Sequence, residues 1–140
     1  DWLVVTDNSA FSGIPHRVAF TRVDGDQLAT TQVLDIEDPF DVSASPFADM
    51  VLVGSGIRNA LIPVRLTEDG WTAGPAVARP RLPGRMVVMP SGPLAGRVYL
   101  AENTGVRQLQ FEPDGGVTDL GATDIGTGKD TIVGSIGVQP

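Results

Sequence analysis

The sequence predicts an all-β fold, and three observations support this. Within the 140 residues, no window repeats apolar residues every 3.6 positions, as an amphipathic helix would. Apolar residues instead form runs of three to five or alternate with polar ones, which is typical of strands. Asp-Gly pairs, a strong hairpin signal, begin at residues 24, 69 and 114, 45 residues apart each time. Four short strands every 45 residues are typical of β-propeller blades, so we expect about three blades of four antiparallel strands.

Each repeat unit is read as an apolar run, a polar loop, an alternating run and an Asp-Gly turn. The first unit lacks its first strand, two units are complete, and a fourth begins near the end of the chain. The expected units span about residues 1–38, 39–84, 85–127 and 128–140. Strands are expected over residues 1–6, 17–23, 28–34, 41–45, 50–53, 61–66, 71–77, 85–89, 97–101, 106–111, 117–120 and 131–138. Pro63 predicts an edge or a bulge, because proline removes a ladder donor.

Three blades do not close a ring, because propellers have about four to eight. Unclosed blades leave apolar faces and strand edges exposed. The chain is therefore expected to be part of a longer polypeptide or to assemble with further copies into a six-bladed ring. We favour the first, because both ends fall inside strand patterns. A plain β-sandwich is the rival architecture.

Composition narrows the partners that we expect. The chain has 10 basic and 17 acidic residues and a formal charge of −7, whereas nucleic-acid binding requires a concentrated basic face. We therefore expect no nucleic-acid partner, and no apolar run is long enough to predict a membrane span. There is no cysteine to form a disulfide, bind zinc or act as a nucleophile. A cysteine-free chain fits any compartment, and we favour a periplasmic or extracellular one.

Antiparallel strands place successive loops at opposite ends of each blade. One end carries the Asp-Gly turns, and we call it the hairpin end. The other, the loop face, is formed by residues 8–15, 35–40, 54–60, 78–84, 102–105 and 121–130. In propellers such a face commonly surrounds the channel mouth and binds ligands. The candidate ligand-binding residues are Asp7, Asn8, Arg58, Asn59, Glu102, Asn103 and Arg107. No catalytic residue, metal site or cofactor is predicted.

The repeat units resemble the Tyr-Val-Thr-Asn type of repeat found in lactonase-like and related bacterial seven-bladed propellers. The matching stretches are Val4-Val5-Thr6-Asp7-Asn8 and Val98-Tyr99-Leu100-Ala101-Glu102-Asn103, each followed by an alternating strand and an Asp-Gly turn. The middle unit departs from the pattern, with Gly54-Ser55 at that place. The resemblance covers nearly the whole chain and implies the propeller fold. Its motif is short and mostly apolar, so it supports the fold far better than any activity.

Three functions follow as hypotheses. The first is a non-catalytic binding or scaffolding propeller segment that recognises a protein or small ligand through its loop face, because no nucleophile, base or metal set is recognisable. The second, implied by the resemblance, is a lactonase-like hydrolase completed by blades outside this chain. Glu102 and Arg107 would then supply acid–base catalysis and oxyanion stabilisation. The third is a lectin-like oligomer of three-blade subunits. Expected partners are a protein, the remaining blades of the same propeller, or further copies of the chain.

Overall fold

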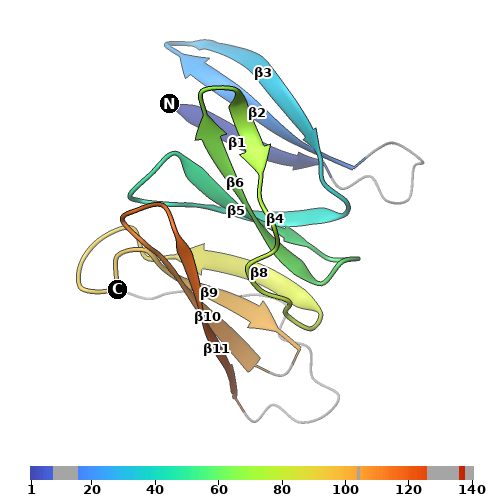
Figure 1. Cartoon of the computed structure of the whole chain (residues 1–140), viewed down its shortest axis with the longest axis vertical. Helices are drawn as coiled ribbons and strands as arrows, with labels where there is room; N and C mark the ends of the chain where they lie inside the picture. The colour runs from blue at the N-terminus through green and yellow to red at the C-terminus, as the bar shows by residue number, and fades with distance from the viewer. Residues whose placement is uncertain (8–15, 104, 126–135, 138–140) are drawn as a thin grey trace.

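The computed structural model describes residues 1–7, 16–103, 105–125 and 136–137, and it contains three antiparallel sheets (Figure 1). Blade one comprises β1 (Trp2–Asp7), β2 (Arg17–Asp24) and β3 (Gln27–Asp35). Blade two comprises β4 (Pro39–Ala44), β5 (Met50–Ser55), β6 (Ala60–Thr67) and β7 (Gly70–Ala73). Blade three comprises β8 (Pro83–Val88), β9 (Arg97–Glu102), β10 (Gly105–Phe111) and β11 (Val117–Asp124). Within each blade, every strand pairs with its neighbours in sequence.

These sheets confirm the all-β prediction of four-stranded antiparallel blades. Blade one has three strands, which correspond to the second, third and fourth strands of the other two blades. The strand expected over 131–138 lies almost entirely outside the described residues. The described part of the chain has no helix with the length and apolar character needed to cross a membrane.

The three Asp-Gly pairs lie at equivalent hairpins, as predicted. Asp24-Gly25 joins β2 to β3, Asp69-Gly70 joins β6 to β7, and Asp114-Gly115 joins β10 to β11. Glycine is required there because the backbone φ angles at residues 25, 70 and 115 are +59°, +101° and +86°. Figure 1 shows these hairpins in its left-hand half, whereas the β5–β6 and β9–β10 turns lie on the right.

Blade two is covered on both of its faces. One face buries Val51, Val53, Val64 and Trp71 against Val18, Phe20 and Ile36 of blade one. The other buries Met50, Leu52, Leu61 and Ala78 against Val98, Leu100, Leu109 and Phe111 of blade three. Because alternate residues of a strand face opposite sides, β5 is buried at every position. A two-sheet sandwich, which would leave one face of each sheet in solvent, is therefore the wrong architecture for this chain.

Aromatic rings and one amide of blade one contact Trp71 in β7, the outer strand of blade two. The Phe20 and Trp71 rings stack with centroids 4.3 Å apart, and Trp2 meets Trp71 edge-on at 5.5 Å. The Gln32 side chain accepts a hydrogen bond from the backbone N–H of Trp71 (2.6 Å) and donates one to the backbone carbonyl of Trp71 (2.7 Å). The amide of Gln32 thereby pairs with the backbone at the free edge of β7.

The edge or bulge predicted at Pro63 is wrong, because β6 pairs with β5 and with β7 without a register shift, and the irregularity lies in β7 instead. β6 is an inner strand, and Pro63 has no N–H to offer to β7. β7 ends at Ala73, earlier than expected, and the chain returns to β6 only at Ala78, which bridges Leu61. Between these points the Gly74 N–H donates to the Pro63 carbonyl at 2.8 Å.

Blade one has one apolar face without a cover in the structure. Leu3 and Val5 in β1 take the places that Val51 and Val53 take in β5. The first two are 44% and 45% exposed, whereas the second two are 3% and 0% exposed. The corresponding face of blade one is therefore apolar but open to solvent.

Truncating Leu100 is expected to lower the free energy of unfolding by about 2–5 kcal/mol, because Leu100→Ala leaves a cavity between blades two and three. Leu28, 64% exposed, provides the control: Leu28→Ala is expected to change that free energy by about 0.5 kcal/mol or less. Urea denaturation followed by circular dichroism measures both. Equal losses for the two variants would contradict the packing of blade two on blade three.

Candidate functional site

The loop face carries most of the predicted binding residues. Asp7 ends β1 and is exposed, Arg58 and Asn59 lie in the β5–β6 turn, Glu102 ends β9, Asn103 follows it, and Arg107 lies within β10. Asn8 lies outside the described residues. Two groups of these residues make contacts, one around Arg107 and one around the connections between blades.

Arg107 is the centre of a charged cluster in blade three. Its Nε and Nη2 atoms donate to the two carboxylate oxygens of Glu102 at 2.8 and 3.2 Å. Its Nη1 atom donates to Asp119 Oδ2 at 2.7 Å. The side chains of Arg107, Glu102 and Asp119 are 17%, 9% and 29% exposed. Two predicted residues are thus brought together, and both carboxylate oxygens of Glu102 are used by one guanidinium.

The local backbone explains why these three side chains meet. Glu102 pairs with Gly105 across the β9–β10 hairpin, so Arg107, two residues further on, shares its face of the sheet. Asp119 of β11 pairs with Leu109, two residues beyond Arg107 in β10, so its side chain lies on the same face as Arg107. The pairing of β10 with β11 shifts between Gln108 and Leu109, where Leu120 is the extra residue of β11. Gly121, with a φ of +91°, completes this bulge, and its N–H donates to Asp119 Oδ1 at 2.9 Å.

The cluster holds Arg107 in its charged form. Its hydrogen bonds to Glu102 raise the pKa of the guanidinium above its ordinary value. Burial lowers that pKa, but the charges of Glu102 and Asp119 together with the hydrogen bond to Asp119 keep the net shift upward. A guanidinium that keeps its proton and is paired on three nitrogens binds anions poorly and does not act as a general acid.

The connection from blade one to blade two is fixed by its backbone at Asp38. The Asp38 N–H donates to His16 Nδ1 at 2.5 Å, and the Asp38 carbonyl accepts from the Gly56 N–H at 3.0 Å. The Ser55 hydroxyl donates to the preceding carbonyl, that of Glu37, at 2.5 Å.

The connection from blade two to blade three repeats this arrangement at Leu82. The Leu82 N–H donates to Asn59 Oδ1 at 3.3 Å, and the Leu82 carbonyl accepts from the Asn103 N–H at 3.4 Å. Asp38 and Leu82 both have left-handed backbones, with φ of +48° and +47°, and both precede a proline that begins a strand. Such a conformation is strained for residues other than glycine, so these bonds hold it in place.

The two arrangements define a connector clasp in which one blade offers a side-chain acceptor and the next blade offers a backbone donor. The acceptors are equivalent in the two blades: His16 lies just before β2, and Asn59 lies just before the corresponding strand, β6. Asn59 and Asn103, predicted as ligand contacts, therefore meet at the backbone of Leu82. Sequence reasoning missed this role, although two residues followed by proline 44 positions apart, at 38 and 82, were a usable signal.

Arg58 makes a surface ion pair with Glu37 on the same face. Its Nε atom lies 2.7 Å from Glu37 Oε2, and the two side chains are 61% and 48% exposed. Solvent screening leaves such pairs a contribution of about 0–1 kcal/mol. This contact also links the β5–β6 turn to the first connection, and its exposed position leaves Arg58 accessible to a partner.

A shallow hollow of about 240 Å³ opens beside Glu102 on the loop face. Its lining residues are Arg81, Glu102, Asn103, Gly105, Ala122, Thr123 and Asp124. Arg81 comes from the blade two–three connection, and within the described chain it forms no ion pair. No group of three His, Asp or Glu side chains among the described residues is placed to hold a metal ion. The arrangement therefore offers polar recognition groups of mixed charge.

Comparisons with known proteins agree with the fold. No family model matches this sequence, and no curated protein matches it. Among solved structures, the chain is similar to the crystal structure of a functionally unknown protein from Desulfotomaculum acetoxidans DSM 771, with a TM-score of 0.64 and 23% sequence identity. The match covers 85% of this chain and 39% of that chain. At this identity the likeness shows the fold alone.

Removing Arg107 is expected to be much more costly than removing Arg58. Arg107→Gln leaves Glu102 poorly solvated and without its ion pair, so the free energy of unfolding should fall by about 2–4 kcal/mol. Arg58→Gln makes the same chemical change at an exposed pair and should cost less than about 1 kcal/mol. Thermal or urea unfolding compares the two, and similar losses would show that the Arg107 cluster is effectively solvated.

The clasp at Asn59 separates a backbone effect from a side-chain effect. Asn59→Gly removes only the acceptor for the Leu82 N–H and should cost about 1 kcal/mol. Asn59→Ala also places a Cβ-bearing residue that lacks a local hydrogen bond at a φ of +46°, which adds about 1–2 kcal/mol. Unfolding free energies measure both. An alanine variant as stable as the glycine variant would rule out the left-handed backbone at Asn59.

Proposed function

We propose that this chain is a non-catalytic binding and scaffolding segment of a propeller that recognises a partner through its loop face. The observation that carries the proposal is that polar side chains of this face are already engaged in holding the blades. Glu102 and Arg107 neutralise each other, and the Asn59 side chain accepts a hydrogen bond from the Leu82 N–H, beside the backbone bond from the Asn103 N–H to the Leu82 carbonyl. These contacts give a firm platform and leave no activated base or nucleophile among them.

The groups that remain available suit a polar partner. Arg81 is exposed at the rim of the 240 Å³ hollow, and Thr123 and Asp124 form part of its wall. Arg58 and Asp7 extend the accessible charge over the neighbouring blades. Mixed charge on a rigid surface favours recognition of a protein loop or a small polar ligand that carries both signs.

The hydrolase alternative draws less support from this geometry. Lactone hydrolysis would require a carboxylate that accepts a proton and a donor that stabilises the oxyanion. Glu102 would first have to release both hydrogen bonds from Arg107. None of the contacts described above specifically supports the lectin-like oligomer.

We also propose that another blade covers blade one. The exposed apolar face with Leu3 and Val5 corresponds to faces that are buried in blades two and three. Among the described strands, none pairs with the outer edge of β1, where the other blades carry an additional strand. The partial coverage of the similar solved chain, 39%, is consistent with further blades of the same propeller as the occupant.

Selection of binders against the purified chain tests the loop-face proposal without a known partner. Peptides selected from a displayed random library should bind wild type and the hairpin-end control Arg22→Glu, and should lose at least tenfold in affinity for Arg81→Glu. Both substitutions change the charge equally and concern exposed arginines, one near the hairpin end of blade one and the other on the loop face. Binders sensitive only to Arg22→Glu would contradict the loop face as the recognition surface. Turnover of a γ-lactone that Arg107→Gln abolishes would contradict the non-catalytic assignment.

A further inference from the structure

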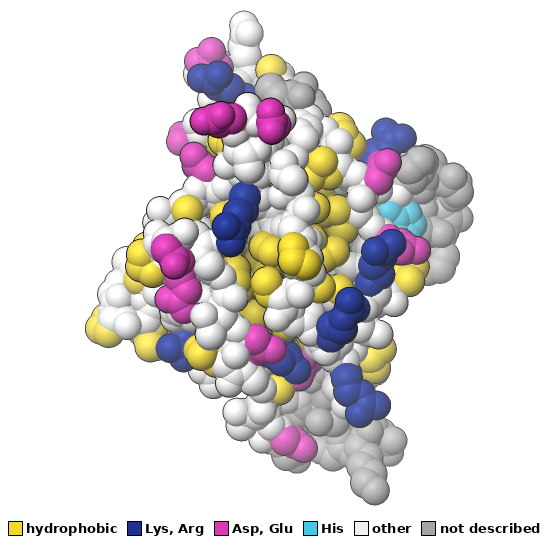
Figure 2. Space-filling model, in the orientation of Figure 1, with side chains coloured by type: hydrophobic (Ala, Val, Ile, Leu, Met, Phe, Trp, Pro, Cys, Tyr) yellow, Lys and Arg dark blue, Asp and Glu magenta, His cyan; other side chains and the backbone are white. Residues whose placement is uncertain are grey.

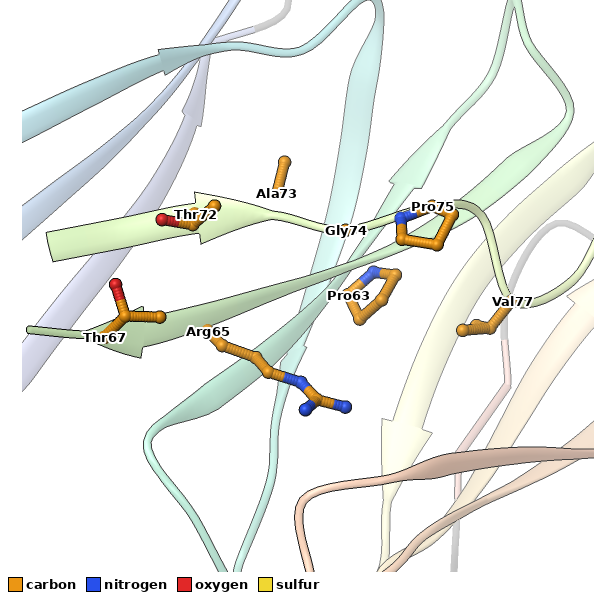
Figure 3. Close-up of a pocket in the computed structure, with 8 residues that line it drawn as sticks. All are labelled: Pro63, Arg65, Thr67, Thr72, Ala73, Gly74, Pro75 and Val77. Carbon is orange, nitrogen blue, oxygen red and sulfur yellow. The ribbon is translucent and has the colours of Figure 1, made fainter. Parts of the chain in front are cut away.

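A second hollow lies away from the loop face, on the side of blade two that faces blade three. Its volume is about 370 Å³, within the range of small-molecule sites. Figure 2, in the orientation of Figure 1, shows hydrophobic side chains gathered at the centre of the molecule and bordered by basic and acidic ones. Figure 3 shows the lining side chains, which come from β6, β7 and the chain that follows β7.

The hollow exists because β7 leaves the sheet early. Pro63 cannot donate to a partner strand, and Gly74-Pro75 turns the chain away until Ala78 rejoins Leu61. The detached segment is still fixed, since the Gly74 N–H donates to the Pro63 carbonyl at 2.8 Å and the Val77 N–H donates to the Leu61 carbonyl at 2.9 Å. The walls are therefore held by backbone hydrogen bonds, and the shape is present before any ligand arrives.

In blade three the outer strand does not leave the sheet at the corresponding place. There Gln108 in β10 faces Tyr99, as Pro63 faces Leu52, and β11 stays paired with β10 as far as Asp124. The bulge in β11 is absorbed within the ladder. The early departure of the outer strand, which forms the hollow, is thus a feature of blade two that the described part of blade three does not share.

The lining combines apolar walls with one cationic group. Pro63, Ala73, Pro75 and Val77 supply the apolar surface. In Figure 3 the Arg65 side chain extends from β6 so that its guanidinium lies beside Pro63, with Val77 beyond it. Arg65 is exposed, and among the described residues its guanidinium forms neither an ion pair nor a hydrogen bond.

This combination defines the class of ligand. An apolar wall stabilises a compact hydrocarbon or aromatic body by burial, and a guanidinium with free donors binds a carboxylate through two parallel hydrogen bonds. We propose that the blade-two hollow binds a small amphipathic carboxylate, with its apolar body against Pro63, Pro75 and Val77 and its carboxylate on Arg65. The hollow is separate from the loop face, so this site stands independently of the function proposed above.

The net charge of −7 opposes an anionic ligand but does not prevent its binding. At physiological ionic strength, charges more than about 8 Å away are largely screened. The direct contact with Arg65 therefore outweighs distant carboxylates. Raising the salt concentration weakens both the attraction to Arg65 and the repulsion from distant carboxylates. The preference for an anion therefore rests on the short-range hydrogen bonds from Arg65.

Titration of the 15N-labelled chain with 3-phenylpropionate, observed by 1H–15N NMR, tests the proposal. The acid should give saturable shifts centred on the amides of Arg65, Gly74 and Val77. The neutral isostere 3-phenylpropionamide should bind at least about tenfold more weakly, because it lacks the charge-assisted hydrogen bonds. Arg65→Gln should remove this preference, whereas Arg58→Gln, the same change at the loop face, should leave it intact.

Three results would overturn the proposal. Shifts that do not saturate, or that centre elsewhere, would show that the hollow is no site for this class. Equal affinity for the acid and the amide would remove the role of Arg65. Equal loss in the Arg58→Gln and Arg65→Gln variants would assign the effect to overall charge. None of these results bears on recognition at the loop face.

Discussion

Burial of both faces of blade two is the constraint on which the rest of the structure depends. An isolated four-stranded sheet with two apolar faces does not stay in solution, so each face requires a neighbour. β5, with its run Met50 to Val53, meets blade one through alternate residues and blade three through the others. The stacking of one blade on the next thus follows directly from an apolar strand that lacks a polar side.

The same constraint decides where polar groups are used. Once the blades are stacked, the chain must pass from the outer strand of one to the inner strand of the next, and it does so at the loop face. Asp38 and Leu82 adopt left-handed backbones at these crossings, and each is hydrogen-bonded by both blades that it joins. A face usually considered for ligand binding is here also the place where the blades are fastened. Recognition at this face would therefore use the residues that fastening leaves accessible, Arg81 and Arg58 foremost.

Local signals in the sequence were sufficient to predict the strands and the three Asp-Gly hairpins, because turn chemistry and alternation act over a few residues. The Arg107 cluster could be predicted only in part. Glu102 and Arg107 are close in sequence, but Asp119 reaches them from another strand, and its position beside Arg107 depends on the register in which β10 pairs with β11. The roles of Asn59 and Asn103 depend on the path of a connection 20 or more residues away from each, which periodicity does not describe.

The blade-two hollow was not predicted, although the sequence carried its cause. Pro63 signalled an irregular sheet, and Gly74-Pro75 signalled a chain that turns. Only the structure shows that Pro63 and Gly74-Pro75 lie opposite each other on neighbouring segments and that Arg65 lies beside the hollow between them. Irregularities of this kind are where a repeated blade differs from its neighbours, so they are reasonable places to look for individual function.

The most direct test of the central claim is the pattern of nuclear Overhauser effects from the methyl groups of β5. The stacked arrangement predicts that Val53 shows effects to Val18 and Phe20 of blade one, whereas the adjacent Leu52 shows effects to Leu100 and Leu109 of blade three. If one of these two residues shows contacts only within its own sheet, blade two has a solvent-facing side and the account of stacked blades is wrong.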